Sequence, residues 1–128
     1  MTVLKATQVD AAEALIRAYY TRVDDNDPAM FELFHPDIRY KRPGYPLIEG
    51  MGAFRDFYSG TRIIKEGSHQ VHSMFRTGSR IAVEGWFTGV LRDGSRVQLP
   101  FSDFFDLVED DGAMLIVSRR TYFDDTRV

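Results

Sequence analysis

The chain has 128 residues, the usual size of one domain, and its 27% charged and 44% hydrophobic residues are typical of a globular protein. A net charge of −3, with no block of lysine and arginine, argues against a nucleic-acid partner. The absence of cysteine excludes disulfides, thiolate metal sites and thiol nucleophiles.

No stretch approaches the roughly 18 apolar residues that a membrane span needs. Residues Met1 to Thr7 also hold no long apolar run of the kind found in a signal peptide. The sequence therefore predicts a cytoplasmic protein without a membrane partner. It contains no glycine-rich phosphate loop, nucleophile elbow or zinc-binding helix motif, so we expect neither a cofactor nor a metal.

The first half of the chain has helical periodicity. Apolar residues recur at spacings of three and four from Val9 to Val23, which predicts one buried face of a helix. Asp27-Pro28 then predicts the N-cap and first residue of a second, short helix. His35-Pro36 ends that helix, because the residue before proline avoids the helical conformation. Two further short elements are predicted, a strand over residues 38–42 and a helix over residues 51–59.

After Gly60 the apolar pattern changes to a period of two, which is typical of strands. Asp93-Gly94 and Asp111-Gly112 are strong signals for hairpin turns. Three helices followed by an antiparallel meander predict an α+β fold, in which the helices cover the apolar face of a curved sheet. The four predicted strands cover residues 63–76, 80–91, 96–108 and 113–123.

Several stretches carry a resemblance to a known family. They are Ala18-Tyr19-Tyr20, Asp24-Asp25-Asn26-Asp27, Phe34-His35-Pro36-Asp37-Ile38, Ile48-Glu49-Gly50, Phe101-Ser102-Asp103-Phe104-Phe105 and Arg120-Thr121-Tyr122-Phe123-Asp124. In these stretches and in the order of elements, the chain resembles the nuclear transport factor 2-like superfamily, which includes ketosteroid isomerases, SnoaL-like polyketide cyclases and epoxide hydrolases. The resemblance implies a single SnoaL-like domain over residues 1–128, with a cone-shaped antiparallel or mixed sheet wrapped around three N-terminal helices.

The ketosteroid isomerases suggest roles for two residues. By this resemblance, Tyr19 matches their oxyanion-hole tyrosine and Asp103 matches their protonated aspartate. Their general-base aspartate falls where this chain has Arg42, and a cation cannot abstract a proton bound to carbon. The usual steroid-isomerase mechanism is therefore not expected.

The epoxide hydrolases match less well. Those of the limonene type place their catalytic residues near Gly85, Phe87 and Thr121, and that triad is absent here. Those of polyether metabolism use paired carboxylates, for which this chain offers Glu66 with Arg42 in place of the partner. SnoaL-like cyclases remain the nearest match, since they activate an acidic methylene with one carboxylate in an apolar pocket.

Strand alternation predicts the wall of a ligand pocket between the sheet and the first helix. If Asp103 points inward, alternate residues of its strand and of the neighbouring strands do so as well. The mouth of such a cone is a natural site for a small apolar molecule. The predicted lining is Tyr19, Tyr40, Ile81, Val83, Phe87, Phe101, Arg119, Thr121 and Phe123.

Asp103 is the main candidate for acid or base catalysis. Its phenylalanine neighbours would raise the carboxyl pKa by desolvation, whereas an ion pair with Arg42 or Arg119 would lower the pKa and leave a structural residue. We expect at least one of Tyr19 and Arg42 to approach Asp103 or the space beside it. Arg42 is also a candidate anchor for a ligand oxyanion or carboxylate, the alternative being a surface arginine at a strand end.

His69 is the second candidate for proton transfer. It shares strand parity with Val71 and Phe75, which predicts that it faces the pocket as a proton shuttle. The alternative is a structural or solvated histidine. His72, three residues away, would lie on the opposite face, so the two cannot chelate one metal ion from a regular strand.

Two functions remain open on the sequence. The first is a cofactor-independent enzyme of secondary metabolism, such as antibiotic biosynthesis, that isomerises, cyclises or opens an apolar polyketide- or terpenoid-like substrate. The second is a non-catalytic member of the fold that binds an apolar ligand or acts as a dimeric interaction module. In either case we expect a homodimer that packs through the outer face of the sheet, where Trp86, Phe104 and Met74 are predicted to lie.

Overall fold

The computed structural model describes the backbone of residues 6–124 and 128, with side chains from residue 11 onward. The sequence predictions that concern the side chains of Met1 to Thr7 and of Val9 lie outside this described part. Within the described part of the chain, no helix has the length and apolar character needed to cross a membrane.

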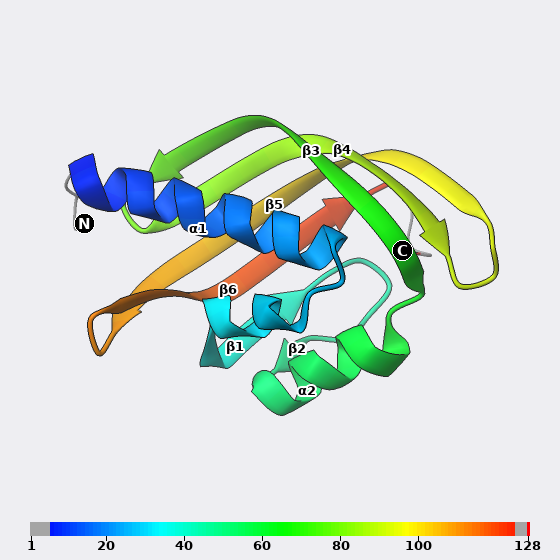
Figure 1. Cartoon of the computed structure of the whole chain (residues 1–128), viewed down its shortest axis with the longest axis horizontal. Helices are drawn as coiled ribbons and strands as arrows, with labels where there is room; N and C mark the ends of the chain where they lie inside the picture. Colours follow the sequence, from blue (N-terminus) through cyan, green and yellow to red (C-terminus); the bar gives the residue numbers. More distant parts are fainter. Residues whose placement is uncertain (1–5, 125–127) are drawn as a thin grey trace.

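Helix α1, Ala6–Asp24, lies across the inner face of a curved sheet (Figure 1). Its buried stripe follows the predicted spacing of three and four, because those positions recur on one side of a helix. This stripe consists of Ala12, Ile16, Tyr19, Tyr20 and Val23.

The short helix η1, Pro28–Leu33, is a 3-10 helix that begins at the predicted cap. The Asp27 carboxylate accepts a hydrogen bond from the Ala29 N–H at 2.9 Å, and Pro28 occupies the first helical position. The helix ends at Leu33, before the predicted stop at His35-Pro36, because Phe34 is already extended and opens a strand.

Helix α2, Met51–Asp56, continues into the π-helical turn η2, Phe57–Thr61. The predicted stop at Gly60 is therefore one residue early, since the turn runs through this glycine to Thr61. The Arg62 N–H donates to the Phe57 carbonyl oxygen at 2.7 Å and closes the turn. Such single π turns are frequent at functional sites.

Six strands form one mixed sheet in the order β2-β1-β6-β5-β4-β3. Neighbouring strands are antiparallel except β1 and β6, which pair in parallel and place the C-terminal strand beside the first one. The four long strands match the prediction to within two residues. The predicted hairpin turn at Asp111-Gly112 is confirmed, with positive φ at both residues. The strands are β1 Phe34–Lys41, β2 Ile48–Glu49, β3 Ile64–Thr77, β4 Arg80–Leu91, β5 Arg96–Asp110 and β6 Ala113–Phe123.

A bulge in β3 corrects two predicted orientations. The register shifts between Val71 and Ser73, so Met74 pairs with Val83 on the inner side while Phe75 pairs with Ala82. One extra residue in a strand exchanges the two faces beyond it. Met74 therefore packs against the core instead of facing outward, and Phe75 is 64% exposed instead of facing the pocket.

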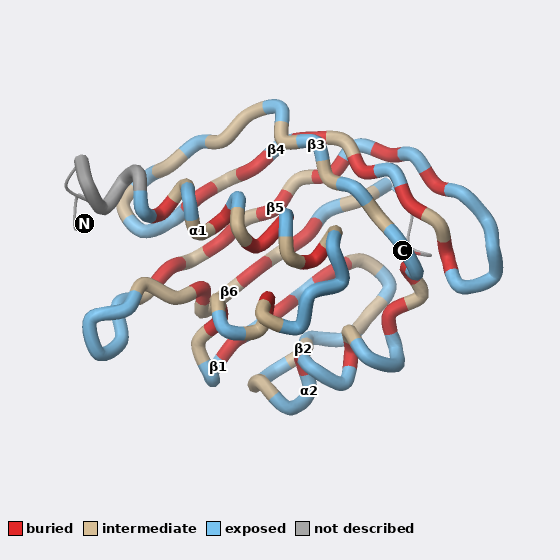
Figure 2. Tube along the Cα trace, viewed as in Figure 1, coloured by how far each residue is buried: buried red, intermediate tan, exposed pale blue. Residues whose placement is uncertain are grey.

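Alternate residues of β4 and β5 are buried, as Figure 2 shows, and they include Phe87, Phe101 and Phe105. A Cβ atom added to Gly67 or Gly89 would lie 2.5–2.7 Å from the Phe87 ring, so this ring occupies the space above both glycines. The glycine track is therefore covered by the protein's own side chains.

Gly85 provides a stability test of this packing. A Cβ atom at Gly85 would lie 2.1 Å from the Gln70 backbone carbonyl oxygen and 2.8 Å from the Phe101 ring. Because a backbone atom cannot rotate away, we expect Gly85→Ala to lower the free energy of unfolding by about 1–3 kcal/mol in urea titrations. Gly52→Ala is the control, since nothing lies within 4 Å there and alanine favours a helix. Equal urea midpoints for the two variants would contradict this description.

Candidate functional site

At the centre of the molecule, the Asp103 carboxylate is fully buried and held by three side chains from two elements. Arg119 donates from Nε to Oδ1 at 3.1 Å and from Nη2 to Oδ2 at 3.0 Å. The Tyr20 hydroxyl donates to Oδ2 at 2.5 Å, and the Thr121 hydroxyl donates to Oδ1. Both carboxylate oxygens therefore accept two hydrogen bonds each.

This environment decides the charge of Asp103. Burial by itself raises the pKa of the carboxyl. The Arg119 guanidinium and the hydrogen bonds lower it by a larger amount, so the pKa of Asp103 lies below its ordinary value. An ionised carboxylate with four donors has no proton to give and no lone pair directed at a ligand. This state differs from the protonated aspartate that the resemblance implies.

Tyr19 lies beside Asp103, since the Arg119 guanidinium that pairs with this carboxylate is 4.8 Å from the Tyr19 ring centre, but Tyr19 does not bond to the carboxylate. Tyr20 contacts the carboxylate, whereas the adjacent Tyr19 donates to or accepts from the Tyr58 hydroxyl at 2.8 Å. Arg42 donates to the Tyr40 hydroxyl instead. Sequence reasoning missed Tyr20, although Tyr20 follows Ile16 by four residues and therefore belongs to the buried stripe of α1.

Tyr58 extends the polar network toward the α2 side of the molecule. Its hydroxyl accepts a hydrogen bond from Arg119 Nη1 at 3.1 Å and contacts the Tyr19 hydroxyl. Burial raises the pKa of Tyr19 well above that of a free tyrosine, so this hydroxyl keeps its proton. Tyr40 is different, since its burial is outweighed by Arg119 and Arg42, which together lower its pKa.

Arg42, directly after β1, is buried without a carboxylate partner among the described residues. Nη1 donates to the Tyr40 hydroxyl at 3.0 Å, while Nε and Nη2 make no hydrogen bond within the described part of the chain. Its guanidinium lies 5.2–5.6 Å from the ring centres of Tyr45, Phe57 and Phe123. Such a cation is stabilised by ring faces and retains donors for an anion.

His69, on the inner side of β3, forms a pair with Asp24 at the end of α1. Its Nδ1 lies 2.6 Å from Asp24 Oδ1, and its backbone N–H donates to Asp24 Oδ2 at 2.8 Å. Because an ionised carboxylate only accepts hydrogen bonds, Nδ1 carries the proton and Nε2 carries the lone pair. The imidazole packs 4.7–5.1 Å from the rings of Tyr20, Phe87 and Phe101.

Burial lowers the pKa of His69, and the hydrogen bond with Asp24 opposes this shift only in part. The imidazole is therefore neutral at neutral pH. Asp24 was missed as a site residue by sequence reasoning. The available signal was its position, because acidic side chains at the C-terminal end of a helix are unfavourable unless something compensates them.

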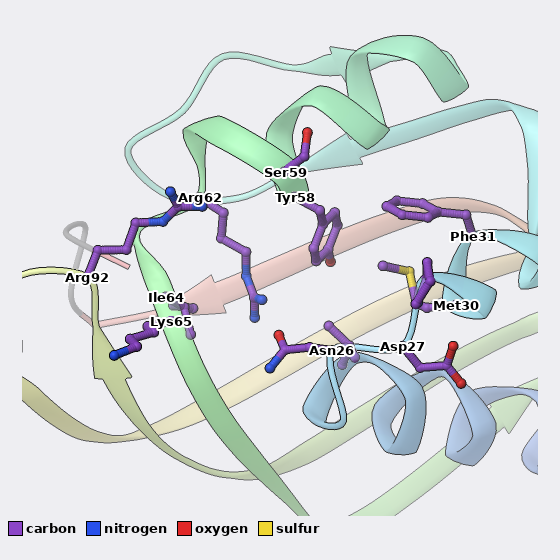
Figure 3. A pocket seen from close by; sticks show the side chains of 12 residues that line it. Asn26, Asp27, Met30, Phe31, Tyr58, Ser59, Arg62, Ile64, Lys65 and Arg92 are labelled. Atoms are coloured by element: carbon purple, nitrogen blue, oxygen red, sulfur yellow. The ribbon is translucent and has the colours of Figure 1, made fainter.

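A cavity of about 520 Å³ opens beside this network, between the end of α1, η2 and the start of β3 (Figure 3). Tyr58 belongs to its wall. The predicted pocket residues Ile81, Val83, Phe87 and Phe101 are packed in the core instead, and Phe123 lies half-buried beside Arg42. The lining residues are Val23, Asn26, Asp27, Pro28, Met30, Phe31, Tyr58, Ser59, Arg62, Ile64, Lys65 and Arg92.

The described residues contain no group of three or more histidine, aspartate or glutamate side chains placed to hold a metal ion. The chemistry that the arrangement itself offers is proton transfer by a neutral imidazole and stabilisation of negative charge by guanidinium and phenol donors.

A curved sheet that encloses helices, a buried polar network and aromatic side chains defines the class of nuclear transport factor 2-like proteins. A family model, the SnoaL-like domain, matches residues 16–117, so the chain belongs to the SnoaL-like domain family. The resemblance stated from the sequence is confirmed. No curated protein sequence matches the chain.

Solved structures show the same fold. A ketosteroid isomerase-like protein from Erwinia carotovora atroseptica is 18% identical, with 94% of this chain and 99% of that chain covered and a TM-score of 0.77. A protein from Jannaschia sp. CCS1, described as a SnoaL-like polyketide cyclase, is 17% identical over 88% and 85% of the chains, with a TM-score of 0.72. TerC, co-crystallised with polyporic acid, is 19% identical over 88% and 91%, with a TM-score of 0.73.

The buried ion pair leads to a stability prediction. Asp103→Asn leaves Arg119 without its counter-charge, so we expect the free energy of unfolding at pH 7 to fall by about 3–5 kcal/mol. Because folding lowers the pKa of Asp103, the pair stabilises the fold above about pH 4 and is lost as the pH falls through the folded value. The difference between wild type and variant should therefore shrink in acid.

Asp106→Asn is the matched control on the same strand. Asp106 pairs with Arg80, whose side chain is 55% exposed, and such a surface pair contributes about 0–1 kcal/mol. Urea titrations of both variants at pH 7 and below pH 4 make the comparison. Equal losses of unfolding free energy in the two variants at pH 7 would show that the buried Asp103–Arg119 pair stabilises the fold no more than the surface pair does.

Proposed function

We propose that this SnoaL-like protein is a cytoplasmic enzyme of secondary metabolism that isomerises or cyclises an apolar, polyketide-like small molecule by acid–base chemistry. The observation that carries the proposal is the His69–Asp24 pair. Asp24 fixes the imidazole tautomer through Nδ1, so Nε2 is free to take a proton from carbon. Asp24 also stabilises the imidazolium that forms in that step.

Arg42 and Tyr40 are the proposed stabilisers of negative charge. When a base removes a proton next to a carbonyl group, charge develops on the carbonyl oxygen, and donors aimed at it lower the barrier. Among the described residues, two nitrogens of Arg42 have no hydrogen-bond partner, and the Tyr40 hydroxyl is polarised by Arg119 and Arg42. Arg42 and Tyr40 would together act as an oxyanion hole.

The two groups lie at opposite ends of an aromatic wall. The His69 ring is 4.7 Å from Phe87, Phe87 is 6.4 Å from Phe123, and Phe123 is 5.4 Å from the Arg42 guanidinium. Because the Phe87 ring is fully buried and fills the space above Gly67 and Gly89, a flat substrate that spans the base and the anion anchor would have to displace this ring. The ligand recorded with TerC, polyporic acid, supports a substrate of this kind.

In this proposal Asp103 and Tyr19 position other groups instead of reacting. Asp103 holds Arg119 and Tyr20, and Tyr20 packs on the His69 ring at 4.9 Å. Tyr19 and Tyr58 fix the other end of Arg119. The proposed catalytic residues are therefore His69 and Arg42.

A binding protein without catalysis is the second candidate. The filled hydrogen-bonding capacity of Asp103 favours it, because the carboxylate expected to react is fully engaged within the protein. In that case the cone would bind an apolar ligand and leave it unchanged. The two functions differ in whether a proton leaves the bound molecule.

Deuterium exchange tests this difference without knowledge of the product. Flat cyclic ketones with an acidic C–H beside the carbonyl are incubated with the protein in D₂O, and loss of the C–H signal is followed by NMR. We expect His69→Asn to slow exchange by about 10²–10⁴-fold, the range for one acid–base group. Asp24 raises the pKa of His69, so Asp24→Asn should slow exchange and move the acid limb of the pH profile to lower pH.

His72→Asn is the matched control, since His72 is exposed at the β3 bulge and should leave the rate unchanged. Equal exchange by wild type and His69→Asn would rule out His69 as the base. Binding of the ketones without any exchange would support the non-catalytic alternative.

We also propose that the protein forms a homodimer through the outer face of the sheet. Phe75 and Tyr122 are 64% and 54% exposed there, and the Phe104 and Tyr122 rings pack together at 5.8 Å. On β4, Trp86 lies two residues after Glu84, which pairs with Ser102. Residues two apart in a strand share a face, so Trp86 also lies on the outer face. Large apolar groups gathered on a solvated sheet face are typical of an interface.

Sedimentation at micromolar concentration measures the mass. We expect about twice the 14.7 kDa of one chain for the wild type and a monomer for Phe104→Glu, because a charge in the interface is desolvated without a partner. Leu47→Glu is the control, since Leu47 is 42% exposed in the loop after β1. A wild-type mass near 14.7 kDa would contradict the dimer.

A further inference from the structure

The 520 Å³ cavity contains an arginine whose charge has no counterpart in the described structure. Arg62 is only 8% exposed, and its Nε is buried without a hydrogen-bond partner among the described residues. Its guanidinium lies over the Tyr58 ring at 5.0 Å, and Figure 3 shows it at the centre of the cavity between Tyr58 and Asn26. A buried donor of this kind is costly unless a ligand satisfies it.

The local backbone explains why Arg62 points into the cavity. Arg62 closes the π-helical turn η2, and its N–H donates to the Phe57 carbonyl oxygen five residues earlier. This turn brings Arg62 beside Tyr58, so the ring supports the flat guanidinium from one side. The arrangement holds the side chain in one orientation before any ligand arrives.

The rest of the lining strengthens the positive charge. Three basic side chains and one acidic side chain line the cavity. The acidic one, Asp27, is engaged as the cap of η1 and points away from the centre in Figure 3. The basic ones are Arg62, Lys65 and Arg92.

An apolar wall faces these charges. Val23 and Met30 are buried, and Phe31 packs edge-on against Tyr58 with 5.9 Å between ring centres. A cavity of 520 Å³ is of the size that encloses a whole small molecule, since ligand sites span about 300–1,000 Å³. The site therefore combines a fixed cationic group with an aromatic and aliphatic surface.

We propose that this cavity binds a small molecule with an aromatic or other flat apolar body and one anionic group, a carboxylate, that pairs with Arg62. The planar carboxylate pairs with the planar Arg62 guanidinium at two points. Lys65 and Arg92 attract the anion from solvent. The inference goes beyond the proposed function, because the lining of this cavity contains neither His69 nor Arg42 and the binding does not depend on catalysis.

Calorimetric titration with naphthalene-2-carboxylate and its neutral amide, naphthalene-2-carboxamide, tests the proposal. The two probes share shape and apolar area, and neither has an acidic C–H beside a carbonyl. We expect the wild type to bind the carboxylate about 10- to 100-fold more tightly than the amide, the factor given by one or two charge-assisted hydrogen bonds. Arg62→Gln should remove this preference, and Arg62→Lys should retain part of it.

Three further variants locate the anion. Arg42→Gln should keep the preference, because Arg42 lies in a different aromatic cage, and the exposed Arg17→Gln serves as the surface control. His69→Asn should also keep it, so failure of catalysis and failure of this binding site give different results. Thermal unfolding by circular dichroism verifies that each variant is folded.

Equal affinity for carboxylate and amide would overturn the proposal, as would loss of the preference in Arg42→Gln instead of Arg62→Gln. Inorganic phosphate is the last probe. Competition by phosphate at the same concentration as the naphthoate would show a simple anion site and would overturn the assigned apolar body.

Discussion

The Asp103–Arg119 ion pair is the interaction on which the interior of this protein depends. It joins β5 to β6 across their pairing, and the Tyr20 hydroxyl attaches α1 to the same carboxylate. Through Tyr58, Arg119 also reaches the segment that follows α2. One buried carboxylate thus sets the distance between the helices and the sheet, and removing it would leave a buried cation and two orphaned hydroxyl donors.

The same pair explains the electrostatic character of the site. In the described part of the chain, the buried charged residues are one aspartate and three arginines, Arg42, Arg62 and Arg119. Since Asp103 neutralises Arg119, the Arg42 and Arg62 guanidiniums remain without a carboxylate among the residues that the structure describes. A protein of net charge −3 therefore has an interior that favours negative charge. Stabilisation of an enolate and attraction of an acidic ligand are two uses of this one property.

The fold could be predicted closely from the sequence because its signals are local. Period-two alternation and the turn at Asp111-Gly112 defined the long strands, and Asp27-Pro28 defined the start of η1. Two local irregularities could not be read in this way. The β3 bulge and the π turn at η2 each add one residue to a regular element, and their positions follow from packing with distant parts of the chain.

The site could be predicted only in part, for a related reason. Strand alternation grouped Asp103 with Phe101 and Phe105 and grouped Arg42 with Tyr40, but it gives the face that residues share and not their partners. Whether Asp103 reacts or is held depended on Arg119 and Tyr20, which are 16 and 83 residues away. Asp24 was missed because its partner, His69, is 45 residues distant. Partners at such separations are set by tertiary structure, which no local pattern encodes.

The place of the cavity follows from how the cone is filled. The Phe87 ring occupies the space above Gly67 and Gly89, and Phe101 crowds Gly85, so the centre of the cone is solid. The free volume lies instead where α1 ends and the chain turns into η1 and η2, segments whose backbone is irregular and cannot pack as closely as paired strands. Arg62 and Tyr58 both line this volume. Because the Tyr58 hydroxyl is bonded to Arg119, a ligand contact at the cavity is two hydrogen bonds away from Asp103.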